Sequence, residues 1–337
     1  MKKFFLLFFF CFTASAFYST VFSQGRIDLG GRWQFRKAGT QEWLEATVPG
    51  CVHTDLMKNK LIPDPYYRDN EKKVQWVSEI GWEYKKDFNV SDTLFRIRHI
   101  ELVCEGLDTY ANVYINDTLI IVADNMFREW FADIRQYLRI GKNTLRIQFP
   151  EMASLNKKRY SQLPLKYPGD AKIMCRKAAY QFGWDWGPKL ITAGIWKPIY
   201  FRTWTYNNLL GVQYIQRSLT DSVANMSAVF TITSTLADSV EVKVFNEKQQ
   251  LVRKRALLKT GVNVVRADFK IMNPKKWWCN GMGEHPLYTL NHEVWFAGRK
   301  EASGTKKIGL RTIELVQKKD TINHSLGRSF YFKLNGV

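Results

Sequence analysis

Short segments with alternating apolar and polar residues run through most of this chain, and they constrain its fold more than any other feature. Val113 and Ile115 alternate with polar residues, a turn at 116–117 follows, and residues 119–122 resume the strand pattern. Residues 145–149 show the same period of two. Several such segments in the first half predict two packed antiparallel sheets, a β-sandwich of the jelly-roll type.

The second half contains further alternating segments, at 228–232, 240–244 and 267–271, separated by turn residues. They predict an immunoglobulin-like sandwich, although the Cys-Trp-Cys core signature of that fold is missing. The aromatic stretch 277–281 is expected to fill the end of this sandwich or to pack against the first one. His292 alternates with apolar neighbours, so we interpret it as a core histidine and not as a ligand.

The first residues have the pattern of a secretory leader. Lys2 and Lys3 precede an apolar run over 4–12, and 14–16 is a small-residue cleavage site, with Ser23 as a second candidate. The apolar run is too short to cross a bilayer as a helix, so an uncleaved anchor is the less favoured alternative. The sequence therefore predicts an exported protein, periplasmic or extracellular, without a membrane span.

The formal net charge of +19 raises the question of a nucleic-acid partner. Lys and Arg are scattered, however, and no run of five or more occurs. We therefore expect no nucleic-acid binding, and at most a salt-sensitive attraction to acidic polysaccharide or an anionic membrane.

Four cysteines follow the leader: Cys51, Cys104, Cys175 and Cys279. They form no CxxC pair, so no zinc or other metal site is expected. Export permits disulfides, and four cysteines allow three complete pairings, but we expect mostly free, buried thiols. The sequence also lacks a glycine-rich phosphate loop, and no cofactor is predicted. A Ser-His-Asp set stays open with five histidines, but no nucleophile-elbow pattern supports one.

A long irregular stretch over 151–189, with one expected helical turn at 176–180, interrupts the strands. Long excursions from a compact sandwich are usually functional or disordered. The stretch contains the heptapeptide 182–188, in which Trp184 and Trp186 flank Asp185 between two glycines. Indole faces stack on sugar rings and a carboxylate accepts hydrogen bonds from hydroxyls, so this tight loop is a candidate carbohydrate contact. The alternative interpretation is structural, with the indoles closing the end of a core.

Six segments that occur in a fixed order carry a resemblance to a known family. They are 81–84, 105–110, 176–188, 192–198, 277–281 with 286–288, and 309–312. Together they resemble the N-terminal portion of the β-mannosidases of glycoside hydrolase family 2, over nearly the whole chain after the leader. In that family two sandwich domains precede a catalytic (β/α)8 barrel.

The resemblance implies the fold, the substrate class and the site residues. The implied domains are a signal peptide over 1–24, a galactose-binding-like jelly roll over 25–207, an immunoglobulin-like sandwich over 208–316 and the start of a truncated barrel over 317–337. Trp184 and Asp185 match the dipeptide that reaches the glycone pocket, whereas Trp186 is given no assigned role and a purely structural one stays open. The family's two catalytic glutamates lie in the barrel and have no counterpart here, so no catalytic residue is assigned. Glu83, Asp87, Glu105 and Asp108 are interpreted as solvated or turn residues.

Three functions remain open on the sequence. The first is the N-terminal part of an exported, exo-acting, retaining β-mannosidase that acts on β-mannoside glycans. Its partner would be the barrel of the same polypeptide, and this chain alone would be inactive. The second is a free-standing carbohydrate-binding module, and the third is a structural or adhesive surface protein.

Overall fold

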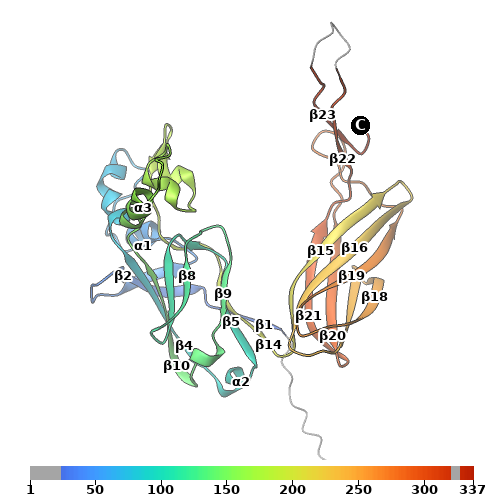
Figure 1. Ribbon diagram of the computed structural model, residues 1–337, viewed down its shortest axis with the longest axis horizontal. Helices are drawn as coiled ribbons and strands as arrows, with labels where there is room; N and C mark the ends of the chain where they lie inside the picture. Colours follow the sequence, from blue (N-terminus) through green and yellow to red (C-terminus); the bar gives the residue numbers. More distant parts are fainter. Residues whose placement is uncertain (1–23, 320–326) are drawn as a thin grey trace, which may run out of the picture.

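The chain forms two separate β-sandwich modules joined at one end (Figure 1). The computed structural model describes residues 24–319 and 327–337, so the predicted leader lies outside the described residues except for Gln24. The prediction of an all-β chain with two sandwiches is confirmed. Among the helices of the described ranges, none combines the length and apolar character needed to cross a membrane.

The first module packs a four-stranded sheet against a six-stranded sheet, and all pairings are antiparallel. The four-stranded sheet has the order β1 (Gly25–Asp28), β14 (Ile199–Trp204), β5 (His99–Cys104) and β9 (Trp130–Asp133). The six-stranded sheet has the order β3 (Leu44–Val48), β2 (Gly31–Lys37), β4 (Trp82–Val90), β10 (Gly141–Phe149), β7 (Ala111–Ile115) and β8 (Thr118–Ala123). One continuous apolar core lies between the two sheets.

The β7–β8 hairpin forms where the sequence predicted it. Asn116 and Asp117 both have positive φ, 47° and 67°, which is the backbone of a type I′ turn. In β10, Leu145, Ile147 and Phe149 are buried while the residues between them are more exposed. The period of two in the sequence therefore reports which side of the strand faces the core.

Short helices gather at one end of the first sandwich, the end that carries the labels α1 and α3 in Figure 1. They are α1 (Val52–Lys58), η1 (Asn70–Glu79), α3 (Met152–Ser161), η3 (Ala171–Met174) and η4 (Ala179–Gln181). The opposite parts of the module carry α2 (Asp92–Phe95) and η2 (Arg135–Tyr137). The expected helical turn at 176–180 is shifted to η4, and the ten-residue α3 was missed. Only Asn156 of α3 is buried, so this helix has no apolar stripe that the sequence could reveal.

The interpretation of Glu83 as a solvated residue is wrong. Its carboxylate is buried on β4 and is bound by Arg36 Nη2 at 2.6 Å and Arg146 Nη1 at 3.1 Å. Asp87, four residues along the same strand, does face solvent and pairs with Lys142 at 3.0 Å. A strand places alternate side chains on opposite faces, but the sequence does not show which polar residue meets a cation from a neighbouring strand.

The second module has seven strands, as in a constant-type immunoglobulin sandwich. One sheet has the order β15 (Asn207–Leu219), β16 (Val223–Ser234) and β19 (Gly261–Met272). The other has the order β18 (Gln249–Leu257), β17 (Ser239–Asn246), β20 (Tyr288–Phe296) and β21 (Arg299–Ile308). His292 is buried in this core beside Leu290 and Val294, and its Nδ1 lies 3.3 Å from the Tyr214 hydroxyl, as expected for a core histidine.

The aromatic stretch 277–281 packs against the end of the second sandwich. The Trp277 N–H donates to Leu310 O at 2.8 Å, and the Arg311 guanidinium lies 4.7 Å from the Trp277 ring. Beyond it, β22 (Ile313–Val316) pairs antiparallel with β23 (Tyr331–Leu334). This terminal hairpin exposes Phe330 and Phe332 to solvent.

The four cysteines of the described chain are free thiols. Only Cys104 is buried, and burial raises the pKa of its thiol. Cys51, Cys175 and Cys279 are partly exposed, so the expectation of buried thiols is wrong for these three.

We expect Glu83→Ala to decrease the free energy of unfolding by about 3 kcal/mol, because it leaves Arg36 and Arg146 poorly solvated without their shared partner. Asp87→Ala, which removes an exposed ion pair on the same strand, should cost less than about 1 kcal/mol. Urea unfolding of the two variants checks the difference. Equal losses would contradict the buried role of Glu83.

Burial lowers the pKa of His292 from 6.5 to about 4. Below about pH 6.5 the unfolded chain therefore binds a proton that the folded chain does not accept until about pH 4. We expect the free energy of unfolding to decrease as the pH falls through this window, and to decrease less in His292→Gln. Urea unfolding at pH 7 and pH 5 measures both slopes, and identical slopes would refute this role.

Candidate functional site

The heptapeptide forms a short hairpin that projects from the helical end of the first sandwich. Three-residue strands, β11 (Phe182–Trp184) and β12 (Gly187–Lys189), pair antiparallel with Trp184 opposite Gly187. The prediction of a loop without strands is therefore wrong in detail, since Asp185 and Trp186 form a two-residue turn between strands. Trp184 is 56% exposed, Trp186 is 84% exposed, and Asp185 also faces solvent. The tip thus presents one carboxylate between two accessible indoles, whose ring centroids lie 5.7 Å apart.

A buried ion pair closes the base of this hairpin. The Lys177 ammonium, fully buried, donates to Asp108 Oδ1 and to Thr192 O, the latter at 2.7 Å. The other carboxylate oxygen, Asp108 Oδ2, accepts from Thr192 Oγ1 at 2.6 Å. Lys177 precedes the hairpin and Thr192 follows it, so one carboxylate on β6 (Leu107–Asp108) holds both stems together.

The electrostatics of the pair follow from its burial. Removal from water lowers the pKa of the Lys177 ammonium, and the Asp108 carboxylate opposes that shift. Asp108 also accepts from Thr109 Oγ1 at 2.6 Å, so its lone pairs are well occupied. The interpretation of Asp108 as a solvated or turn residue is therefore wrong.

A second attachment holds β12 from the side of η1. Glu71 Oε1 accepts from the Lys189 N–H at 2.7 Å, and Gln75 Nε2 donates to Lys189 O at 2.8 Å. Both backbone groups of one strand residue are thus bound to the same helix. Because the hairpin is attached at its base and along one edge, its tip is held in a defined position.

Two cavities flank the hairpin base. One, of about 530 Å³, lies between α1 and the hairpin and is lined on its aromatic side by Tyr66, Tyr180, Trp184 and Trp186. The other, of about 420 Å³, shares Tyr180 and Gln181 with the first cavity and extends to Asp108 and Trp196. Asp185 lines neither cavity.

His53, on α1, lies in the wall of the larger of these two cavities. Burial lowers the pKa of its imidazole to about 4, and the nearby Lys177 charge contributes in the same direction. The side chain is therefore neutral at physiological pH.

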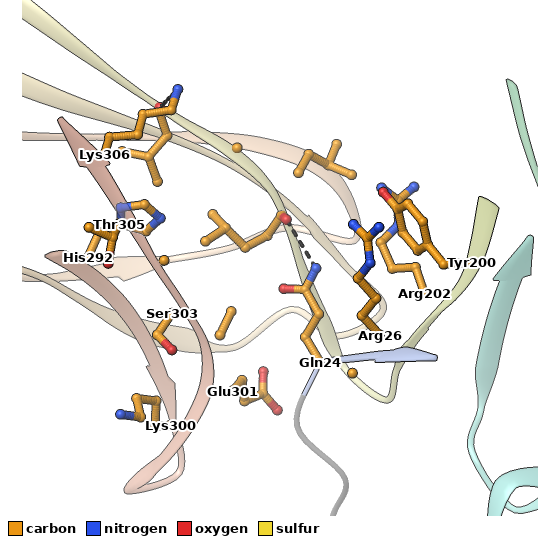
Figure 2. A pocket seen from close by; sticks show the side chains of 17 residues that line it. Gln24, Arg26, Tyr200, Arg202, His292, Lys300, Glu301, Ser303, Thr305 and Lys306 are labelled. Carbon is orange, nitrogen blue, oxygen red and sulfur yellow. Dashed lines mark hydrogen bonds between the residues drawn. The ribbon is translucent and has the colours of Figure 1, made fainter. Parts of the chain in front are cut away.

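A third hollow, of about 630 Å³, lies at the junction of the two modules (Figure 2). Gln24 Nε2 bridges the modules by donating to Asn208 Oδ1 at 2.9 Å and to Leu209 O at 3.3 Å. The cations of this hollow are already engaged. Arg26 pairs with Glu105 at 3.6 Å, Arg202 with Glu101 at 2.7 Å and Lys300 with Glu293 at 3.1 Å. Lys306 Nζ donates to Val212 O at 2.8 Å. We interpret it as an interdomain contact and not as a reaction site.

The described residues contain no candidate metal centre. Within 24–319 and 327–337, no three His, Cys, Asp or Glu side chains lie together as a metal site would require. The buried acids each serve a structural contact: Asp55 accepts from Tyr84 Oη at 2.8 Å, and Glu301 accepts from Asn207 Nδ2 at 2.7 Å. Burial raises the pKa of both carboxyl groups.

Comparison with known proteins identifies the family. The family described as "Glycosyl hydrolase 2 galactose-binding domain-like" matches residues 33–197, and "Glycosyl hydrolases family 2" matches residues 213–311. The chain belongs to glycosyl hydrolase family 2. Its two sandwiches are the galactose-binding-like and immunoglobulin-like domains of that family, as the sequence predicted.

The similar proteins include β-mannosidases. The chain is 33% identical to beta-mannosidase B of Emericella nidulans over 96% of its own length and 38% of that protein. It is 30% identical to the beta-mannosidase of Capra hircus, covering 92% of the chain and 37% of that protein. The crystal structure of a beta-D-mannosidase from Dictyoglomus thermophilum matches with a TM-score of 0.87 and 34% identity, over 93% of this chain and 39% of that one. The chain thus spans less than two-fifths of the length of these relatives and corresponds to their N-terminal part.

Sequence reasoning named the exposed tip but missed what supports it. Trp184 and Asp185 come together at the hairpin turn, and Trp186 beside them is more exposed than Trp184. Asp108, Lys177 and Thr192 were not recognised as a cluster. In the sequence, Asp108 differs from an ordinary turn residue only in that this charged residue directly follows the apolar Leu107.

We expect Asp108→Asn to increase amide hydrogen exchange over residues 178–191, because it removes the charge that binds Lys177 between the two hairpin stems. The protection factors of these amides should decrease by about tenfold or more, since breaking a buried ion pair costs several kcal/mol. Mass-spectrometric exchange of the folded chain measures it.

Glu83→Gln is the matched control, since it weakens another buried acid–base cluster of the same sandwich. It should lower overall stability without selectively exposing the hairpin. If both variants raised exchange over 178–191 equally, the specific support of the hairpin by Asp108 would be refuted.

Proposed function

We propose that this chain is the N-terminal part of an exported, exo-acting β-mannosidase that hydrolyses terminal β-D-mannose residues with retention. The observation that carries the proposal is the exposed tip, in which Asp185 stands between two indoles on a hairpin fixed at its base. The β-mannosidases among the similar proteins support the choice of sugar. Export rests on the predicted leader over 1–24.

In this proposal Asp185 accepts hydrogen bonds from hydroxyls of the glycone that are remote from the reacting carbon. A charged acceptor forms stronger hydrogen bonds than a neutral one, and a fixed tip loses little conformational entropy on binding. Contacts of this kind position the ring and contribute binding energy to the transition state. Trp184 supplies an apolar wall for the C–H face of the same sugar.

The two carboxyl groups that act on the glycosidic bond would come from a barrel in the same polypeptide. Retaining glycosidases hold such groups about 5–5.5 Å apart, and the buried acids described above are each engaged in separate structural contacts. We therefore propose that this chain by itself is catalytically silent.

In the intact enzyme, Asp185→Ala should lower kcat/KM for an aryl β-mannoside by about 10- to 100-fold, which corresponds to one or two lost charged hydrogen bonds. The thermal unfolding midpoint should not change, because the side chain is exposed at a turn. Steady-state kinetics and calorimetry measure the two quantities.

Asp124→Ala is the control, since it removes an exposed carboxylate of the same sandwich outside the hairpin. An Asp185→Ala enzyme with unchanged kcat/KM would refute the assigned contact. Hydrolysis of the mannoside by the 337-residue chain alone would refute the proposal that the catalytic groups lie elsewhere.

A further inference from the structure

The cavity between α1 and the hairpin is uncharged. Its lining consists of apolar, aromatic and uncharged polar residues, together with His53, which is neutral at physiological pH. No Asp, Glu, Lys or Arg is among the lining residues. An ionic ligand would therefore lose its hydration without gaining a counter-charge.

Aromatic rings form much of the cavity wall. Tyr66 is 74% exposed and Tyr180 is 69% exposed, and both contribute to the cavity together with Trp184 and Trp186. Exposed rings that converge on one hollow offer flat apolar faces to a ligand, each with a polar edge. The volume of about 530 Å³ lies in the usual range for small-molecule sites, about 300–1,000 Å³.

Uncharged hydrogen-bonding groups lie among these rings. Thr54, Gln181 and Thr192 carry hydroxyl and amide groups, and Thr192 Oγ1 lies 3.0 Å from Gln181 Oε1. Donors and acceptors of this kind suit a ligand with hydroxyl groups.

His53 contributes a largely closed part of the cavity wall. The residue is only 5% exposed, and its Nδ1 is buried without a hydrogen-bond partner in the described part of the chain. Because Nδ1 has almost no accessible surface, a ligand in the cavity cannot reach this atom. The exposed rings and the uncharged polar side chains are therefore the groups that a ligand would contact.

We propose that this cavity binds a neutral pyranose, as a second sugar position next to the one at Asp185. The apolar faces of the ring stack on the tyrosines and indoles, while its hydroxyls bond to Gln181 and Thr192. The proposal rests on the proposed function in taking β-mannosides as the sugars and Asp185 as the neighbouring sugar contact. Trp184 lines the cavity and Asp185 does not, so the two positions share the Trp184 indole as a common wall and use different polar groups.

The test is saturation-transfer NMR titration of the purified chain with methyl β-mannoside and β-1,4-mannobiose. Glucuronate and glucosamine are the charged comparison sugars. The variants are Tyr66→Ala and Tyr180→Ala in the cavity wall, and Asp185→Ala at the tip. Tyr167→Ala is the matched control, an exposed tyrosine of the same module that does not line the cavity.

We expect the mannosides to bind, and each cavity variant to weaken binding by about two- to tenfold, as the loss of one stacking ring predicts. Binding should persist in Asp185→Ala and Tyr167→Ala, and the charged sugars should bind more weakly than the mannosides. Absence of binding, or binding unaffected by Tyr66→Ala and Tyr180→Ala, would overturn the proposal. Loss of binding in Asp185→Ala alone would overturn it while supporting the sugar contact of the proposed function.

Discussion

The ion pair between Asp108 and Lys177 is the interaction on which the arrangement of the candidate site depends. Both charges are withdrawn from water, which is unfavourable for each alone, and the surrounding hydrogen bonds from Thr109 and Thr192 offset that cost. The pair does more than stabilise a core. Because Lys177 and Thr192 lie on opposite stems of the hairpin segment, one carboxylate fixes how that segment leaves the sandwich and returns to it.

Because its base is fixed, the two-residue turn can hold two exposed indoles and a carboxylate in one arrangement. Indoles exposed to water and an unpaired carboxylate add little to folding, so a flexible loop could hold them in many arrangements. Here Glu71 and Gln75 bind the backbone of Lys189, and the base is closed by the ion pair. The fold therefore limits the conformations of the tip, and in the proposed function this preorganisation would lower the entropy cost of binding a sugar.

The sequence predicted those elements whose pattern is local. The β7–β8 hairpin follows from two residues that tolerate positive φ between alternating segments, and β10 follows from its period of two. Helix α3 could not be predicted, since it buries only Asn156, whose side chain accepts from the Tyr110 hydroxyl at 2.8 Å. The sequence predicted the exposed tip because its indoles and its carboxylate lie within seven consecutive residues. The sequence did not predict the ion pair that supports the tip, because Asp108 is 69 positions from Lys177 and 84 positions from Thr192.

That sequence separation also orders the events of folding. Closing a loop of this size costs chain entropy before its contacts form, and β6 is positioned only when the strands around it have paired. We therefore expect the ion pair to form late, after much of the sandwich has assembled. Until then the two indoles would be exposed to water without the arrangement that the closed hairpin base imposes on them.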